Sequence, residues 1–236
     1  MKTNTDYKNA ALAALKGNWA PAVLATVVFF FLTLLVVSPS EVPLLTGTLT
    51  DIQAAAMSGD IEGMMGMYSQ VMSWSSLGTL LMIFFYSVLY LGFMVAFLRL
   101  LQSGDDRLTS NMFQVAFKNY WHKVWGMFLM YVFIFLWSLL FLIPGIVKAF
   151  SYAMTPYILE EKPELSANEA IDHSRAMMKG HKFDLFWLYL SFIGWGILCL
   201  FTLGIGFLWL TPYMNTAVAA FYEDVKADYE LNGGLI

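Results

Sequence analysis

The sequence has few charged residues. Asp, Glu, Lys and Arg make up 13% of its 236 residues, whereas a soluble domain carries about 25%. Hydrophobic residues make up 59%, and they are gathered in long blocks. This composition excludes an ordinary soluble domain and indicates that a lipid bilayer surrounds most of the chain. We expect the bilayer to be the main partner and expect no nucleic-acid partner. The net charge of −4 gives no clue about partners, because the charges lie in a few connecting segments.

Cysteine and catalytic motifs are also scarce. The single cysteine, Cys199, lies inside an apolar block, which excludes a disulfide framework. His122, His173 and His181 form no His-Glu-x-x-His pair, and the sequence has no nucleophile elbow and no phosphate-binding loop. We therefore predict no catalytic residue, no metal and no cofactor, and a protein that is not an enzyme.

The apolar blocks predict membrane-spanning helices, which need about 20 apolar residues each. The first block follows Trp19 and lacks the Ala-x-Ala exit of a cleavable signal, so we interpret it as a span. Pro144-Gly145 indicates a tight turn between the third and fourth blocks. The prediction is an all-α membrane protein whose residues 1–236 form a single integral membrane domain. Its six transmembrane helices are expected at 20–37, 77–101, 124–143, 146–159, 185–203 and 205–222.

The basic residues predict the topology. Lys and Arg occur before the first span, in 102–123, in 160–182 and in the tail, but not in the loop 38–76. Because cytoplasmic loops carry the excess of Lys and Arg, we expect both termini in the cytoplasm and 38–76 as an outer loop. The one exception is Lys148, which this topology places about one turn below the outer surface.

An internal repeat is visible. Three times a short amphipathic helix runs into a lysine-centred step, then an aromatic residue, then a span. This pattern predicts three helical hairpins, each preceded by a short interfacial helix. The second and third hairpins also share a Thr-Pro-Tyr step, at 155–157 and 211–213. The three lysine-centred steps are Lys16-Gly-Asn-Trp19, Lys118-Asn-Tyr-Trp121 and Lys179-Gly-His-Lys-Phe183.

Several motifs together resemble the DUF975 family, which comprises bacterial multi-pass membrane proteins of unknown function. The resemblance covers nearly the whole chain except the outer loop. It implies six helices and a bacterial plasma membrane, and it supplies no catalytic residue. The motifs are Ala14-Leu-Lys-Gly-Asn-Trp19, Ile143-Pro-Gly-Ile-Val-Lys148, Tyr152-Ala-Met-Thr-Pro-Tyr157, Glu164-Leu-Ser-Ala-Asn-Glu-Ala170, Met178-Lys-Gly-His-Lys182, Leu190-Ser-Phe-Ile-Gly-Trp195 and Thr202-Leu-Gly-Ile-Gly206.

The segment 166–179 predicts a cytoplasmic interfacial helix. Ser166 and Glu169 have the spacing of a capping box, and Gly180 is a natural stop. One interpretation is that the helix docks a cytoplasmic protein partner. The other, which we favour, is that it rests on the inner leaflet.

Apart from Arg99, near the end of the second predicted span, Lys148 is the one basic residue inside a span. Such residues often mark pathways. Lys148 can also extend its ammonium to the headgroups, which we favour. The prolines of the two Thr-Pro-Tyr steps allow kinks. If an intramembrane polar site exists, we expect it to comprise Lys148, Tyr152, Thr155, Tyr213 and Asn215.

Two function classes stay open. The first is a non-enzymatic accessory or scaffold protein of the envelope, located in the plasma membrane. The second is a small-solute transporter or channel with a site between the helical hairpins. The scarcity of charges in the spans disfavours an ion-coupled pump.

Overall fold

The computed structural model describes residues 2–45, 48–67, 69 and 82–231. These residues form helices and connections, with no strand among them. The all-α prediction is therefore confirmed. The chain divides into two compact units, Met1–Phe29 with Val88–Ile236, and Phe30–Ser87.

The unit Phe30–Ser87 contains the expected outer loop, 38–76. It holds the second part of α2 (Trp19–Leu45), α3 (Thr48–Ser58) and the π-helical turn η1 (Met82–Tyr86). Much of the expected loop is thus helical. Residues 46–47, 68 and 70–76 of the loop, and the predicted start of the second span at 77–81, lie outside the described residues.

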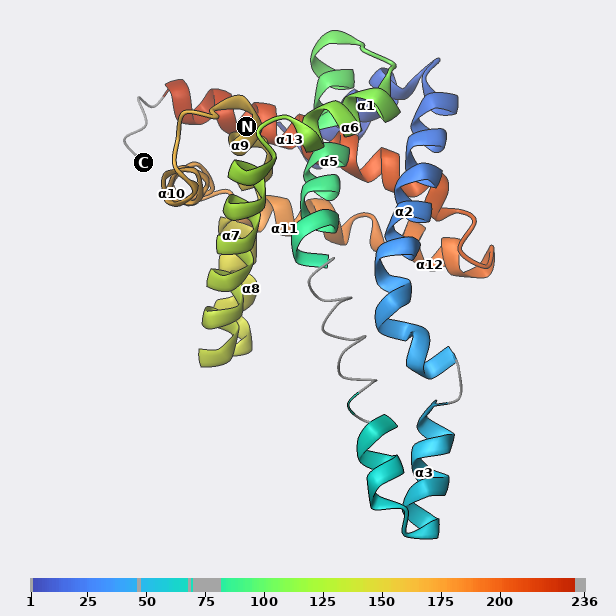
Figure 1. Cartoon of the computed structure of the whole chain (residues 1–236). Helices are drawn as coiled ribbons and strands as arrows, with labels where there is room; N and C mark the ends of the chain where they lie inside the picture. Colours follow the sequence, from blue (N-terminus) through green and yellow to red (C-terminus); the bar gives the residue numbers. More distant parts are fainter. Residues whose placement is uncertain (1, 46–47, 68, 70–81, 232–236) are drawn as a thin grey trace. The chain divides into compact units, whose positions relative to one another are not determined.

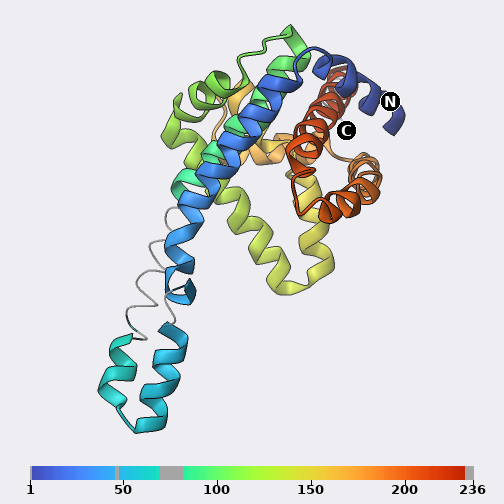
Figure 2. The same ribbon diagram turned by 90° about the vertical axis from the view of Figure 1, so that its right-hand side faces the viewer.

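The other unit holds the rest of the helices (Figures 1 and 2). In Figure 1, α7 and α8 run side by side, whereas α11 and α13 run across them. The elements are α1 (Asn4–Leu15), the start of α2, α5 (Ser87–Ser103), α6 (Leu108–Phe117), α7 (Tyr120–Leu140), α8 (Leu142–Ser151), α9 (Thr155–Glu161), α10 (Ala167–Met177), α11 (Lys182–Leu190), α12 (Ile193–Phe201) and α13 (Phe207–Leu231).

Among the described residues, four helical segments are long and apolar enough to cross a membrane. A fifth candidate is the pair α1 and Trp19–Leu35, which is bent by 98°. These five match the first five predicted spans. The four segments are Phe84–Ser103, Tyr120–Leu140, Leu142–Glu161 and Lys182–Phe201.

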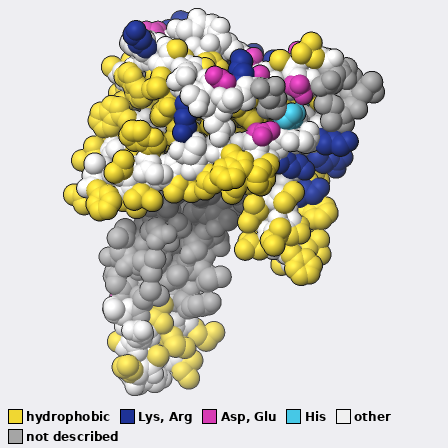
Figure 3. Space-filling model, turned by 180° about the vertical axis from the view of Figure 1, so that it is seen from behind, with side chains coloured by type: hydrophobic (Ala, Val, Ile, Leu, Met, Phe, Trp, Pro, Cys, Tyr) yellow, Lys and Arg dark blue, Asp and Glu magenta, His cyan; other side chains and the backbone are white. Residues whose placement is uncertain are grey.

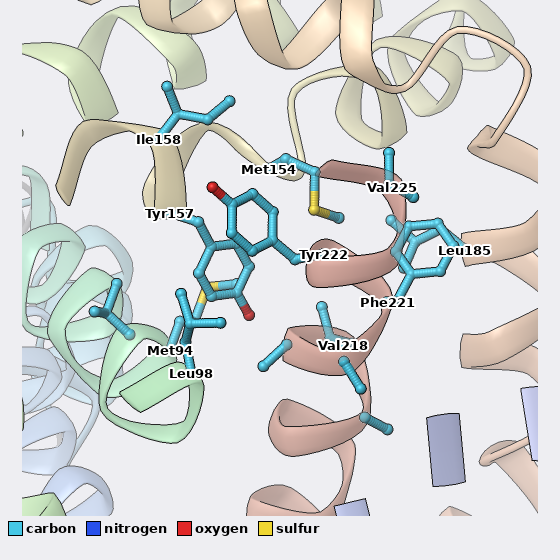
Figure 4. Close-up of a cluster of buried hydrophobic side chains, with 14 of the residues drawn as sticks. Met94, Leu98, Met154, Tyr157, Ile158, Leu185, Val218, Phe221, Tyr222 and Val225 are labelled. Atoms are coloured by element: carbon cyan, nitrogen blue, oxygen red, sulfur yellow. The ribbon is translucent and has the colours of Figure 1, made fainter. Parts of the chain in front are cut away.

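The sixth predicted span, 205–222, is not among these segments. It corresponds to α13, where Thr211, Asn215 and Thr216 interrupt the apolar residues and Glu223 follows. Ten side chains of α13 are nevertheless buried, because α1, α10, α11 and α12 all pack on it. Tyr222 stacks on Tyr157 of α9 in the core, with ring centres 4.6 Å apart (Figure 4). A helix enclosed by protein needs no continuous apolar surface.

The hairpin of α7 and α8 turns at Phe141, whose backbone is extended (φ −158°). The predicted turn at Pro144-Gly145 is wrong, because both residues lie inside α8. Pro144 is tolerated in the first helical turn, where its missing N–H has no partner to lose. Gly145 lies against α7, where an added Cβ would come within 2.1 Å of the Ser138 Oγ.

The three lysine-centred steps share a backbone conformation. The short helices α1, α6 and α10 precede them, as the repeat predicts. In each step, the residue after the first lysine has a left-handed backbone conformation. These residues are Gly17 (φ 86°), Asn119 (φ 53°) and Gly180 (φ 92°). Because glycine and asparagine adopt this conformation most readily, the step ends one helix and redirects the chain into the next.

The two Thr-Pro-Tyr steps are not equivalent. Pro156 lies in the first turn of α9, after a break at residues 152–154, whereas Pro212 lies inside the continuous helix α13. The second and third repeats thus agree at their start and differ at their end.

Gly145 provides a test of the α7–α8 packing. We expect Gly145→Ala to destabilise the protein by about 1–3 kcal/mol, because the added methyl group meets backbone as well as side-chain atoms of Ser138. The measurement is the midpoint of thermal unfolding in detergent. The control is Gly196→Ala in α12, where an added Cβ meets nothing within 4 Å. Equal midpoints for the two variants would contradict the close approach.

Candidate functional site

Two adjacent glutamates end α9 and hold together several helices. Glu160 forms ion pairs with Arg99 of α5 at 2.8 Å and with Lys123 of α7 at 2.5 Å. The Lys123 side chain is 1% exposed, and its ammonium also donates to the carbonyl of Val115 in α6. Arg99 donates to Gln114 of α6 at 3.1 Å. Glu160 thus joins α5, α6 and α7 to α9.

Glu161 extends this network to α13. Its Oε2 accepts from the Tyr222 hydroxyl at 2.7 Å and from the Lys226 ammonium at 2.6 Å. Gln102 of α5 donates to Glu161 at 3.2 Å and to Glu223 at 2.7 Å. We call these residues the glutamate network: Arg99, Gln102, Gln114, Lys123, Glu160, Glu161, Tyr222, Glu223 and Lys226.

The glutamate network fixes the relative positions of five helices at one end of the bundle. Its Lys123–Glu160 pair is desolvated, and removing one partner of a buried pair leaves an uncompensated charge. The predicted topology puts the end of the second span, with Arg99, on the cytoplasmic side. It puts Lys123 and the connection that begins at Glu160 on the same side. That shared side is the sequence signal that makes these residues candidates for pairing.

The predicted intramembrane polar site is divided in the structure. Lys148 lies over the ring of Trp137, 4.4 Å from its centre, and 5.9 Å from the ring centre of Tyr152. Lys148 and Tyr152 both line a pocket of about 270 Å³. Its remaining lining includes Asn168, Asp172 and Arg175 of α10. Lys148 therefore lies beside α10, whereas the predicted topology places these two at opposite surfaces of the membrane.

The other three predicted residues lie elsewhere. The Thr155 hydroxyl is buried and has no hydrogen-bond partner within the described residues. Tyr213 packs edge-on against Phe192 and lines an apolar pocket of about 460 Å³. Asn215 donates to the carbonyl of Thr211 in its own helix. The structure thus brings Lys148 and Tyr152 together and places Tyr213 and Asn215 in other contacts.

The predicted helix 166–179 forms α10, and its capping box is present. The Ser166 backbone N–H donates to Glu169 at 2.7 Å, and the Glu169 N–H donates to the Ser166 hydroxyl. The apolar face of α10 is covered by α7, α9 and α13, so it is occupied by the chain itself. The exposed residues are polar: Asn168, Glu169, Asp172, Arg175 and Lys179.

His173 connects α10 to neighbouring segments. Its Nε2 lies 2.9 Å from the Lys162 ammonium, and its ring lies 5.0 Å from that of Tyr229 in α13. Burial and the positive charge of Lys162 lower the pKa of His173 below its ordinary value of 6.5. The neutral imidazole accepts a hydrogen bond from Lys162.

A comparison with models of protein families shows which family the chain belongs to. The family model described as a protein of unknown function, DUF975, matches residues 1–152 and 141–229. The chain belongs to the DUF975 family. Comparisons with curated proteins and with solved structures give no match.

The DUF975 family is described as having unknown function, so membership in it gives no chemical role to the residues described above. Among the residues that the structure describes, no group of three His, Cys, Asp or Glu side chains could hold a metal ion. The glutamate network and the Lys148 pocket are two polar arrangements that the described residues form.

Glu160 tests the glutamate network. We expect Glu160→Gln to lower the free energy of unfolding by about 3–5 kcal/mol, because buried Lys123 loses its counter-charge. Thermal unfolding in detergent measures the effect. Glu164→Gln removes the same charge from an exposed side chain and should be nearly neutral. A Glu160→Gln midpoint equal to that of Glu164→Gln would show that the network does not hold the helices.

The lowered pKa of His173 predicts that the stability of the folded protein depends on pH. Because its pKa is lower in the folded protein than in the unfolded chain, the unfolded chain binds more protons as pH falls below 6.5. We therefore expect the contribution of His173 to stability to be present above pH 6.5 and to be lost as pH falls through its folded pKa. An NMR titration of the imidazole carbon signals measures the midpoint. A midpoint at or above the ordinary histidine value would contradict the Lys162 contact.

Proposed function

We propose that this protein is a non-enzymatic accessory or scaffold protein of the bacterial plasma membrane, with both termini in the cytoplasm. In this proposal α13 is the sixth crossing, at the centre of the bundle, and the helices form three hairpins with α1, α6 and α10 as cytoplasmic interfacial helices. The glutamate network then closes the cytoplasmic end.

The membrane location is supported by the end of the α7–α8 hairpin. Its apolar side chains are exposed around the turn: Phe141 is 74% exposed, Leu142 72% and Ile143 74%. Figure 3 shows this hydrophobic tip, with Lys and Arg side chains gathered directly above it. Water would make such an exposed surface unfavourable, by roughly 25 cal/mol per Å², whereas the hydrocarbon core of a bilayer accommodates it.

The scaffold role is carried by the glutamate network. It ties five helices together through ion pairs and hydrogen bonds, so opening this end would require separating Glu160 from Lys123 and Arg99. The polar face of α10 lies outside that network and is exposed. We propose that a cytoplasmic protein partner docks on this polar face, since the apolar face of α10 is already covered.

The second candidate function is a small-solute transporter or channel. It is favoured by the pocket of about 270 Å³ beside Lys148, which carries both charged and aromatic side chains. In this case the solute would bind between the α7–α8 hairpin and α10.

Cysteine labelling tests the topology. In a Cys199→Ser background, we expect Ala54→Cys in α3 to react with an impermeant thiol reagent added to intact cells, because 38–76 is outside. Asn168→Cys in α10 should react only after the membrane is permeabilised. Both positions are exposed, so burial does not limit labelling. The reverse pattern would show that the orientation is inverted.

Photo-crosslinking and flux measurements distinguish the two functions. A photo-crosslinking amino acid at Asn168 should give one discrete protein adduct in cells, whereas the same group at Phe135, which is 66% exposed on the α7–α8 hairpin, should give none. Absence of an adduct at Asn168, together with solute uptake into proteoliposomes that Lys148→Gln abolishes, would establish the transporter instead.

A further inference from the structure

Lys148 has positive neighbours and no salt bridge within the described part of the chain. Arg175 and Lys182 both act electrostatically on its ammonium. The neighbouring carboxylate, Asp172, already pairs with Arg175 at 3.1 Å. The three cations and one carboxylate leave an excess of positive charge beside the aromatic rings of Trp137 and Tyr152.

An apolar groove adjoins this cluster. It lies between α8 and α11, has a volume of about 170 Å³, and has Lys182 among its lining residues. Lys182 therefore belongs to the groove and also acts on Lys148, so the basic cluster and the groove are neighbours. The other lining residues are Ile146, Val147, Phe150, Phe183 and Phe186.

The exposed side chains along α8 place the basic cluster of Lys148, Arg175 and Lys182 at the boundary between an apolar and a charged surface. From Leu142 to Val147 the apolar side chains are exposed: Leu142 72%, Ile146 48% and Val147 45%. The next residue is Lys148, which faces the polar residues of α10. Beside Lys148 the surface thus changes from apolar to charged, as the acyl chains of a lipid change to its headgroup.

We propose that this surface binds an anionic phospholipid. The phosphate lies between Lys148, Lys182 and Arg175, and one acyl chain lies in the α8–α11 groove. Charge complementarity selects an anionic headgroup, since basic pockets beside membrane helices bind such lipids, and phosphate accepts charge-assisted hydrogen bonds from Lys and Arg. The groove selects a lipid over free phosphate, which has no apolar part. This proposal rests on the membrane location proposed above, but not on the docking partner.

The bound phosphate also accounts for Lys148. An unpaired ammonium beside hydrocarbon is unfavourable. The Trp137 ring face offsets part of this cost. An anionic headgroup adds negative charge where Asp172, the neighbouring carboxylate among the described residues, already pairs with Arg175. The lysine thus requires neither a solute pathway nor an acidic partner from another span.

Native mass spectrometry of the purified full-length protein in detergent tests the proposal. The probes are phosphatidylglycerol and phosphatidylcholine with identical acyl chains. We expect phosphatidylglycerol to be retained about tenfold more strongly, the difference that one charge-assisted contact makes. Lys148→Gln and Arg175→Gln should each remove most of that preference. Lys179→Gln, which removes an exposed charge from outside the pocket, should leave it unchanged.

A second pair of variants tests the groove. Phe186→Ala should weaken retention of phosphatidylglycerol, whereas Phe201→Ala, at an 82% exposed position of α12, should not. Excess glycerol 3-phosphate should fail to displace the lipid. Displacement by it would show that a free phosphate is the ligand.

Equal retention of the two lipids, or equal effects of Lys148→Gln and Lys179→Gln, would overturn the proposal. If Lys148→Gln does not fold, Arg175→Gln decides, because its side chain is 54% exposed and pairs only locally. Lys148→Arg should retain the lipid preference. Because the purified protein has no partner present, failure of lipid binding is distinguishable from failure of the scaffold role.

Discussion

The buried ion pair between Lys123 and Glu160 is the constraint on which the arrangement of the main unit depends. A lysine that is 1% exposed requires its counter-charge at a fixed position, so the end of α9 has to reach α7. The break at residues 152–154 and the new helical start at Thr155 bring α9 to that position. The neighbouring Glu161 then holds α13 through Tyr222 and Lys226, so one pair of glutamates positions both the α7–α9 segment and the central helix.

Apolar contacts support the same arrangement from within. Figure 4 shows Tyr157 and Tyr222 stacked among side chains of α5, α9, α11 and α13. Tyr157 and Glu161 lie four residues apart in α9, and they contact α13 through Tyr222 from one helical face. Stacking and hydrogen bonding to Glu161 therefore act on the same pair of helices, α9 and α13.

Local features of this chain were predictable from the sequence, because a few adjacent residues determine them. The capping box of Ser166 and Glu169, the short helices before the lysine-centred steps and the first five apolar segments all belong to this class. The DUF975 resemblance is also confirmed. The turn at Phe141 was not predicted, because Pro and Gly also suit the first turn of a closely packed helix.

Features that depend on tertiary contacts were not predictable in the same way. Hydropathy does not reveal how α13 packs, because α1, α10, α11 and α12 cover much of its surface. The distance of Lys148 along the chain from the expected turn predicts its depth in the membrane but not its contact with α10, which lies beside it. The glutamate network required pairing residues as distant as Gln102 and Glu223, although the shared side of the membrane made Arg99, Lys123 and Glu160 candidates for one another.

Amide hydrogen exchange in lipid nanodiscs tests most directly whether the glutamate network holds these helices as one unit. With the native protein, we predict that α9 and the adjoining ends of α5, α7 and α13 share the same slow exchange. With Glu160→Gln, exchange should accelerate in all four together. Acceleration confined to α9, with α5, α7 and α13 unchanged, would contradict the account.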